Sequence, residues 1–360
     1  MLWLWLACNA PSDTIRVDQA WVLPSRRAHH ATVAWTSEGP VVAWTTGAPR
    51  SRSFTAEVGG EGRELAGRDA AKPDVVASPR GAPWIALQTP NDGLWLEPPG
   101  RPARRWAASE LARVNASVDL AVAADGPRAV WYDADGLGRA SIRGWSADAG
   151  LGATPALPAV IATFDDTVRS APDVACTPDG HTWVAYTEQW LDGPDVLVVD
   201  TYAPDGHHAG HFRHSSPDRA LMPRRPTVSV GSDGHAVAVF RELDADRRTH
   251  GAWLVALDDH AEPLAPARRV WPEADRPVVE RLGAATVLVV AEVPDEAGSR
   301  IEAARFAWPD FTPLGKPIRV SPEGRNARRP HVAIRADARS AVVSYETAGG
   351  RVAVHRLQLP

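Results

Sequence analysis

Short apolar runs with an alternating pattern recur along the whole chain, and turn residues separate each pair of runs. The clearest copy covers residues 172–186, where Asp179-Gly180 divides two β-type runs. The next copy covers residues 226–240 and carries Asp233-Gly234 at the same place. Asp-Gly between two alternating apolar runs is a strong signal for a β-hairpin. The pattern therefore predicts a chain built from β-hairpins.

Seven copies of this hairpin are recognisable. They start at residues 31, 73, 118, 172, 226, 277 and 330. Units of roughly 40–55 residues, each with four short strands, are typical of β-propeller blades. In the fourth unit we expect the strands near residues 172–177, 182–187, 195–203 and 208–214. The sequence thus predicts an all-β, seven-bladed β-propeller of four-stranded antiparallel blades.

The two ends of the chain complement each other. The last unit supplies only three strands, near residues 331–335, 341–346 and 351–358, whereas residues 14–23 are strand-like and belong to no unit. We expect this N-terminal strand to close the last blade, because closure removes an exposed sheet edge. A pair of β-sandwiches is the competing fold, and it explains neither the seven copies nor the complementary ends.

Charge and composition narrow the classes of partner. The net charge of −5 offers no basic surface for a nucleic acid, and no apolar run reaches the roughly 18 residues of a membrane-spanning helix. No motif for a phosphate-binding loop, a zinc protease or a serine hydrolase is present. We therefore expect no nucleic-acid partner, no cofactor and a monomeric protein.

The first eight residues suggest a membrane anchor. They are apolar up to Leu6-Ala7-Cys8, which resembles the end of a bacterial lipobox, where the cysteine is lipidated. We expect residues 1–7 to be the remnant of a signal peptide, residues 8–13 a tether and residues 14–360 a single propeller domain. Membrane contact would then run only through a lipid at Cys8 and place the protein in the bacterial cell envelope. Without the lipid, the protein would be secreted.

Charged residues recur at two strand ends that share one face of the predicted propeller, which we call the top face. In an antiparallel blade, the residues just before the first strand and just after the second lie at the same end, beside the central channel. Before first strands stand Lys72, Arg225, Arg276 and Arg329. After second strands stand Asp133, Glu188, Glu292 and Glu346, and Trp190 follows as a candidate aromatic platform for a sugar.

This rim has two interpretations. The functional one is a polar pocket at the channel mouth for a charged or sugar-like ligand, since binding usually resides in loops on a rigid scaffold. The structural one is a ring of arginine–carboxylate pairs that lock neighbouring blades together. The sequence leaves both open.

Two other groups of residues contain metal-ligating side chains. His207, His208, His211 and His214 cluster around one turn, but His207 and His211 would lie about 13 Å apart on an extended strand, at roughly 3.3 Å per residue. A metal ion needs ligands that converge. The acidic loop that begins at Asp133 lacks most of a calcium loop, including its closing glutamate. The sequence therefore predicts no metal site.

The repeat resembles the sialidase-like (BNR-type) superfamily of propellers and bacterial lipoproteins that carry degenerate versions of its repeats. The resemblance rests on the Pro-x-Val strand starts and on Asp-Gly hairpins such as Thr177-Pro-Asp179-Gly180-His-Thr182-Trp183. This segment lacks the residue that separates Asp and Gly in the Asp-box, and it lies between first and second strands. The catalytic roles of sialidases are therefore not transferred to this chain.

Two functions remain. The first is a non-catalytic scaffold on the cell envelope that binds a protein or a glycan through its top face. The alternative is a glycan-active enzyme, a sialidase-like glycoside hydrolase or a lyase, that uses two rim carboxylates as acid and base. A hydrolase of that kind needs two carboxylates about 5–10 Å apart in a pocket.

Overall fold

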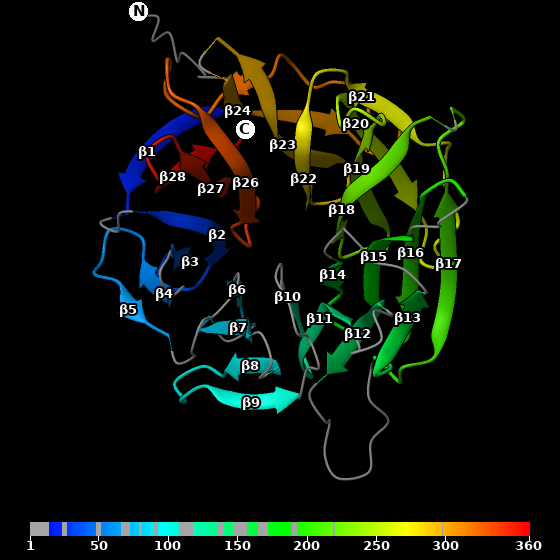
Figure 1. The fold of residues 1–360 in the computed structure, drawn as a ribbon, viewed down its shortest axis with the longest axis horizontal. Coiled ribbons are helices and arrows are strands. Elements are labelled where there is room, and N and C mark those ends of the chain that lie inside the picture. Colours follow the sequence, from blue (N-terminus) through cyan, green and yellow to red (C-terminus); the bar gives the residue numbers. More distant parts are fainter. Residues whose placement is uncertain are drawn as a thin grey trace, which may run out of the picture.

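A computed structural model shows a closed ring of seven four-stranded antiparallel sheets (Figure 1). It describes residues 14–23, 27–47, 52–65, 73–78, 81–89, 93–107, 118–134, 140–146, 157–164, 172–188, 193–218, 220–296 and 298–360. The predicted all-β, seven-bladed propeller is confirmed. In the described part of the chain, nothing helical is long and apolar enough to cross a membrane.

Each of the first four blades is formed by consecutive strands. Blade 1 contains β2 (Ala28–Trp35), β3 (Pro40–Thr46), β4 (Arg52–Glu57) and β5 (Arg63–Glu64). Blade 2 contains β6 (Pro73–Ala77), β7 (Pro83–Thr89), β8 (Gly93–Glu97) and β9 (Arg104–Ala107). Blade 3 contains β10 (Val118–Ala123), β11 (Gly126–Ala134), β12 (Ala140–Ser146) and β13 (Val160–Phe164). Blade 4 contains β14 (Asp173–Cys176), β15 (Thr182–Glu188), β16 (Val196–Tyr202) and β17 (His208–His214).

The last three blades complete the ring. Blade 5 contains β18 (Met222–Val230), β19 (Ala236–Leu243), β20 (Thr249–Leu257) and β21 (Arg268–Trp271). Blade 6 contains β22 (Asp275–Leu282), β23 (Thr286–Asp295), β24 (Gly298–Ala307) and β25 (Ile318–Arg319). Blade 7 contains β26 (Ala327–Ile334), β27 (Ser340–Thr347), β28 (Arg351–Gln358) and the N-terminal β1 (Arg16–Val22).

The N-terminal strand closes blade 7, as predicted. β1 pairs antiparallel with β28, so that Arg16 lies opposite Gln358 and Val22 lies opposite Ala353 (Figure 1). The guanidinium Nε of Arg356 lies 3.6 Å from the Asp18 carboxylate across this pair. One blade thus joins both ends of the described chain and leaves no gap in the ring.

Apolar side chains fill the spaces between the blades. Seven buried clusters occur among the described residues, one at each interface between neighbouring blades. Alternate residues of a strand face opposite neighbours: on β19, Val237 and Val239 pack towards blade 6, and Ala238 and Phe240 towards blade 4. Tryptophans of the second strands take part in these clusters: Trp44 between blades 7 and 1, Trp84 and Trp131 between blades 2 and 3, and Trp183 between blades 4 and 5.

The first strand of each blade lies nearest the central axis (Figure 1). These seven strands contact one another in a ring, in the order β2, β6, β10, β14, β18, β22, β26 and back to β2. Residues at the start of a first strand therefore meet residues of the two adjoining blades. This arrangement places Arg225, Arg276 and Arg329, which lie on the first strands β18, β22 and β26, around one channel.

Candidate functional site at the channel mouth

The first strands of blades 1, 5, 6 and 7 carry a β-bulge at the same place, just before the repeated strand start. One residue in each bulge adopts a left-handed backbone conformation that is uncommon for residues other than glycine. These residues are His30 (φ 51°), Arg225 (φ 50°), Arg276 (φ 44°) and Arg329 (φ 54°). A bulge re-aims a side chain and is common next to functional sites. All three arginines that the sequence assigned to the rim occupy this position.

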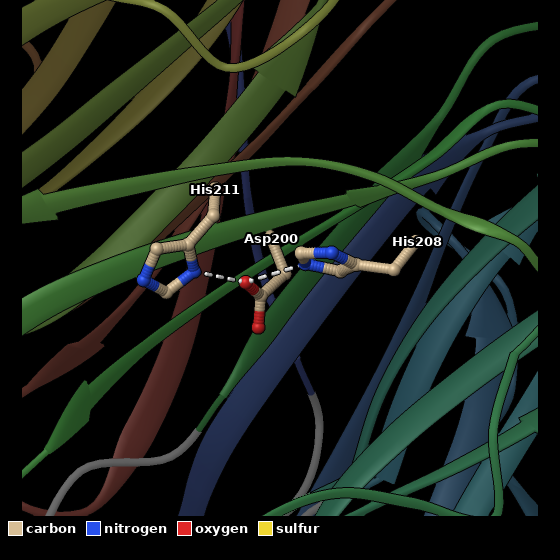
Figure 2. A group of neighbouring side chains, drawn as sticks. All are labelled: Asp200, His208 and His211. Carbon is tan, nitrogen blue, oxygen red and sulfur yellow. Dashed lines mark hydrogen bonds and ion pairs between the residues drawn. The ribbon is translucent and has the colours of Figure 1, made fainter.

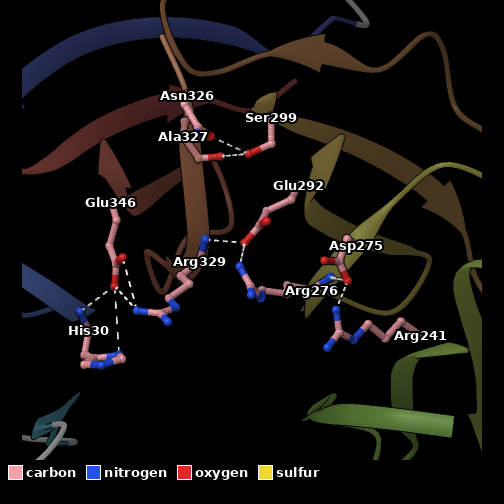
Figure 3. Close-up of polar contacts among 10 residues, drawn as sticks. All are labelled: His30, Arg241, Asp275, Arg276, Glu292, Ser299, Asn326, Ala327, Arg329 and Glu346. Atoms are coloured by element: carbon pink, nitrogen blue, oxygen red, sulfur yellow. Dashed lines mark hydrogen bonds and ion pairs between the residues drawn. The ribbon is translucent and has the colours of Figure 1, made fainter. Parts of the chain in front are cut away.

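Glutamates at the ends of two second strands tie the bulges of neighbouring blades together (Figure 3). Glu346 Oε1 accepts a hydrogen bond from Arg329 Nη1 at 2.9 Å and one from the backbone N–H of His30 at 2.8 Å. Glu292 Oε1 accepts one from Arg276 Nη1 at 2.8 Å and one from the backbone N–H of Arg329 at 2.5 Å. Each glutamate thus binds the arginine of its own blade and the backbone of the next.

Blade 5 reverses the charge at the corresponding position. Arg241 stands where blades 6 and 7 carry Glu292 and Glu346, and it forms an ion pair with Asp275 of blade 6. Asp275 Oδ1 also accepts a hydrogen bond from the backbone N–H of Arg276 at 2.8 Å. The structural interpretation of the rim is therefore correct in part, because these contacts join blades 5, 6, 7 and 1.

The part of this network that the structure describes nevertheless contains more guanidinium groups than carboxylates. Four guanidinium groups, those of Arg225, Arg241, Arg276 and Arg329, face three carboxylates, those of Asp275, Glu292 and Glu346. The Arg225 side chain is exposed to solvent, yet protein surrounds it closely enough for desolvation to lower the pKa of its guanidinium. Repulsion from Arg241, Arg276 and Arg329 adds to that effect, and the pKa falls to about 10.

Two of the predicted rim carboxylates point away from the mouth. Glu188 binds Arg213 of β17, the outermost strand of its own blade, and the Asp133 carboxylate lies 3.6 Å from Arg143 of β12. Each lies one residue later along its second strand than the position that Glu292 occupies in blade 6 and Glu346 in blade 7. Because side chains alternate along a strand, that single step turns them to the other side of the sheet. Lys72 and Trp190, with Cys8, lie outside the described residues.

A second polar group lies farther into the channel, at positions that the rim pattern did not include. Asp74, Asp119 and Asp173 occupy the second position of the repeat in three successive first strands. Their Oδ2 atoms accept hydrogen bonds from the backbone of the next blade: from Leu120 at 2.8 Å, from Val174 at 2.6 Å and from Val228 at 2.7 Å. These carboxylates thus link the first strands of blades 2 to 5. The signal in the sequence was a carboxylate inside an apolar run, as in Pro172-Asp173-Val174.

Burial raises the pKa of these three carboxyl groups and that of Glu280, which lies on β22 and accepts a hydrogen bond from Ser229 of β18. The pKa of Asp74 and that of Glu280 each rise to about 7. The pKa values of Asp119 and Asp173 lie well above the usual range, chiefly through desolvation and also because the carboxylates repel one another. A carboxylic acid that keeps its proton near neutrality has the property that general acid catalysis requires.

A cleft of about 1100 Å³ separates the turns of blades 1 and 2 on the opposite face. Its polar lining is mainly acidic and includes Glu38, Glu57, Glu61, Glu64 and Glu97. Arg63 also lines it and forms an ion pair with Glu97. Among the described residues, one group brings side-chain ligand atoms together as a metal ion requires: Asp200, His208 and His211, at the outer edge of blade 4.

Comparison with known proteins identifies the fold but not the family. No model of a protein family matches the chain, and no curated protein is similar to it in sequence.

Several solved structures share the architecture over nearly the whole chain. The polysaccharide lyase Uly1 has a TM-score of 0.59 at 8% identity, over 96% of this chain and 100% of that chain. A protein of unknown function from Dyadobacter fermentans has a TM-score of 0.55 at 13% identity, over 96% and 99%. The α-L-arabinanase of Penicillium chrysogenum has a TM-score of 0.53 at 10% identity, over 96% and 98%. The chain therefore has the fold of propellers that include glycan-active enzymes.

Proposed function

We propose that this protein binds an acidic glycan, one whose sugars carry carboxylate groups, at the mouth of the central channel. The observation that supports the proposal is the position of Arg225, an exposed residue at the rim. The pKa of its guanidinium is lowered by desolvation and by three neighbouring arginines, although Asp275 attracts it. A carboxylate ligand would relieve this repulsion and would accept two parallel hydrogen bonds from one guanidinium.

The surrounding groups suit a sugar better than a simple anion. Glu292, Glu346 and Asp275 supply acceptors around the arginines, and sugar hydroxyls can donate to such oxygens. The solved propellers of similar shape include an arabinanase and a polysaccharide lyase. This is an analogy of fold, which by itself does not establish a function.

Binding without catalysis is the better supported form of the proposal. Glu292 and Glu346 each accept hydrogen bonds from a guanidinium and from a backbone N–H. The Oε1 atom of each glutamate is thus engaged in holding two neighbouring blades together, and a substrate would have to displace these hydrogen bonds. The rim carboxylates therefore do not supply the acid of the enzyme alternative.

A glycan-active enzyme remains the second candidate, with different residues. Asp74 and Glu280 lie in the channel and have pKa values of about 7. Such groups could act as acids on a substrate that enters from the mouth. Hydrolysis or lyase activity that is abolished by Glu280→Gln would support the enzyme over the scaffold.

We also propose that the protein is a monomer held in the bacterial cell envelope by a lipid on Cys8. The apolar segment that ends in Leu6-Ala7-Cys8 supports this proposal. Mass spectrometry of the protein from its native membrane should find a diacylglyceryl group on this cysteine. An unmodified Cys8 with residues 1–7 retained would refute it.

Calorimetric titration with oligogalacturonate, compared with the same oligosaccharide reduced at its carboxyl groups, tests the glycan proposal. We expect the reduced, neutral glycan to bind about tenfold more weakly or worse, because one charged hydrogen bond contributes about 1.5–3 kcal/mol. Arg225→Asn should cause a similar loss, and asparagine tolerates the left-handed backbone at this position.

Arg247→Asn is the matched control, since Arg247 is exposed, has φ 61° and lies outside the mouth network. It should leave the affinity unchanged. Equal binding of the acidic and the reduced glycans, or equal binding by wild type and Arg225→Asn, would contradict the proposal.

A further inference from the structure

At the outer edge of blade 4, two histidine side chains contact the same carboxylate oxygen of Asp200 (Figure 2). Asp200 Oδ1 lies 2.6 Å from His211 Nδ1 and 3.1 Å from His208 Nε2. Asp200 belongs to β16, and both histidines belong to β17. All three ligand atoms lie within 4.8 Å of one another.

A β-bulge explains why two histidines three residues apart face the same side. Thr201 lies opposite Gly210, whereas Tyr202 lies opposite His208, so that Ala209 is an extra residue in β17. On a regular strand, His207 and His211 would lie about 13 Å apart, at roughly 3.3 Å per residue. The bulge and the neighbouring strand β16 instead bring His208 and His211 together at Asp200.

Two tyrosines hold the carboxylate of Asp200 and the ring of His208 in place. Asp200 is only 4% exposed, and its second oxygen, Oδ2, accepts a hydrogen bond from the Tyr186 hydroxyl at 2.8 Å. The ring of His208 packs edge-on against Tyr202, with 5.4 Å between ring centroids. In metal sites, a carboxylate ligand usually also accepts a hydrogen bond from a neighbouring group. Neighbouring groups likewise fix the orientation of the imidazole ligands.

A buried carboxylate is stabilised by a positive charge beside it. Among the residues that the structure describes, the ion-pair partners of Asp200 are the same two histidines. Burial of a carboxylate is costly unless a charge or a metal ion compensates it. The two imidazoles are the exposed members of the group, so coordination positions beside them are open to solvent.

The distances are close to those of a bound metal ion. Ligand atoms about 2.0–2.2 Å from a tetrahedral metal ion lie roughly 3.3–3.6 Å apart. To admit such an ion, the 2.6 Å contact of Asp200 Oδ1 with His211 must open by about 0.7–1.0 Å, and the 3.1 Å contact with His208 by about 0.2–0.5 Å. Two imidazoles with one carboxylate favour zinc and its first-row neighbours over calcium or magnesium, which prefer oxygen ligands.

We infer that Asp200, His208 and His211 form a binding site for a divalent first-row metal ion, with zinc as the expected occupant. The site clamps the two outer strands of blade 4 and keeps at least one coordination position for water or another ligand. It is independent of the glycan proposal, because the channel mouth is built from blades 1, 5, 6 and 7.

Titration of the chelator-treated, tag-free full chain with ZnCl₂, in competition with a chromophoric chelator, tests the inference. Wild type should bind one equivalent, and Co²⁺ should give the visible absorption of a low-symmetry site. His211→Ala should lower the zinc affinity by about 100-fold or more, and Tyr186→Phe by about 10–100-fold. His207→Ala is the matched control, since His207 lies beside the group and outside it, and its affinity should equal that of wild type.

The melting temperature in the presence of chelator verifies that the variants are folded, because His208 and His211 are exposed and their removal creates no cavity. Zinc should raise the melting temperature of wild type and of His207→Ala, but not that of His211→Ala. Zinc binding by His211→Ala as tight as that of wild type, or less than one equivalent bound to wild type, would overturn the inference.

Discussion

Replacement of Asp74 by asparagine should make the protein more stable at alkaline pH. The Asp74 side chain is 3% exposed, and burial raises the pKa of its carboxyl to about 7, against 3.8 when it is free. Because the folded-state pKa is the higher one, the group contributes stability that is fully present below pH 3.8. That stability is lost as the pH rises to about 7.

The size of the effect follows from the shift. A rise from 3.8 to about 7 corresponds to about 4 kcal/mol, at 1.36 kcal/mol per unit of pKa. Asparagine keeps an oxygen to accept the hydrogen bond that the Leu120 N–H donates at 2.8 Å, and it carries no charge at any pH. Loss of one charge also relieves the repulsion on Asp119 and Asp173. We therefore expect Asp74→Asn to be more stable than wild type by about 2–4 kcal/mol at pH 8.

Urea unfolding at pH 5, 6, 7 and 8 measures this difference. The advantage of Asp74→Asn over wild type should grow steadily across the series and level off above pH 7. Asp246→Asn, at an exposed turn position, is the control and should follow the wild-type profile. Parallel pH profiles of Asp74→Asn and wild type would show that burial of the Asp74 carboxylate does not destabilise the folded protein.

Two further predictions concern the ring itself. Deletion of residues 14–23 should cause aggregation or a large loss of stability, because it exposes the edge of β28; size-exclusion chromatography measures it, and a stable monomer would contradict the closure argument. Glu292→Gln should lower the free energy of unfolding by about 1–3 kcal/mol, because it removes the charge that holds Arg276 and the bulge of blade 7. Urea unfolding measures this free energy, and an unchanged midpoint would show that the contacts of Glu292 do not stabilise the ring.

The blade count and the ring closure could be predicted because they depend on local patterns. Each Asp-Gly turn specifies a hairpin, and the missing strand of the last unit has one candidate, residues 14–23. These patterns can be recognised without knowledge of the strand register. The fold was therefore accessible from the sequence alone.

The rim depended on register, which the sequence does not reveal. The three arginines share one rim because their bulges recur at the same position within the first strands. Asp133 and Glu188 were grouped with Glu292 although they lie one residue past the position that faces the mouth. One residue decides the side of a sheet to which a side chain points.

The channel carboxylates and the group around Asp200 were missed for related reasons. Asp173 appeared as the start of a strand, and only the ring geometry shows that it reaches the backbone of the next blade. His208 and His211 are brought together by an extra residue in β17, and Asp200 reaches them from β16. Contacts between strands and bulges within them arise from tertiary packing, for which a single sequence offers no local signal.

The most direct test of the proposed function is a crystal structure of the protein with an oligogalacturonate bound. A sugar carboxylate should lie within hydrogen-bonding distance of Arg225, about 3 Å, with the glycan spanning the mouth towards Arg276 and Arg329. A glycan bound in the cleft between blades 1 and 2, or elsewhere with the mouth free of it, would contradict the account.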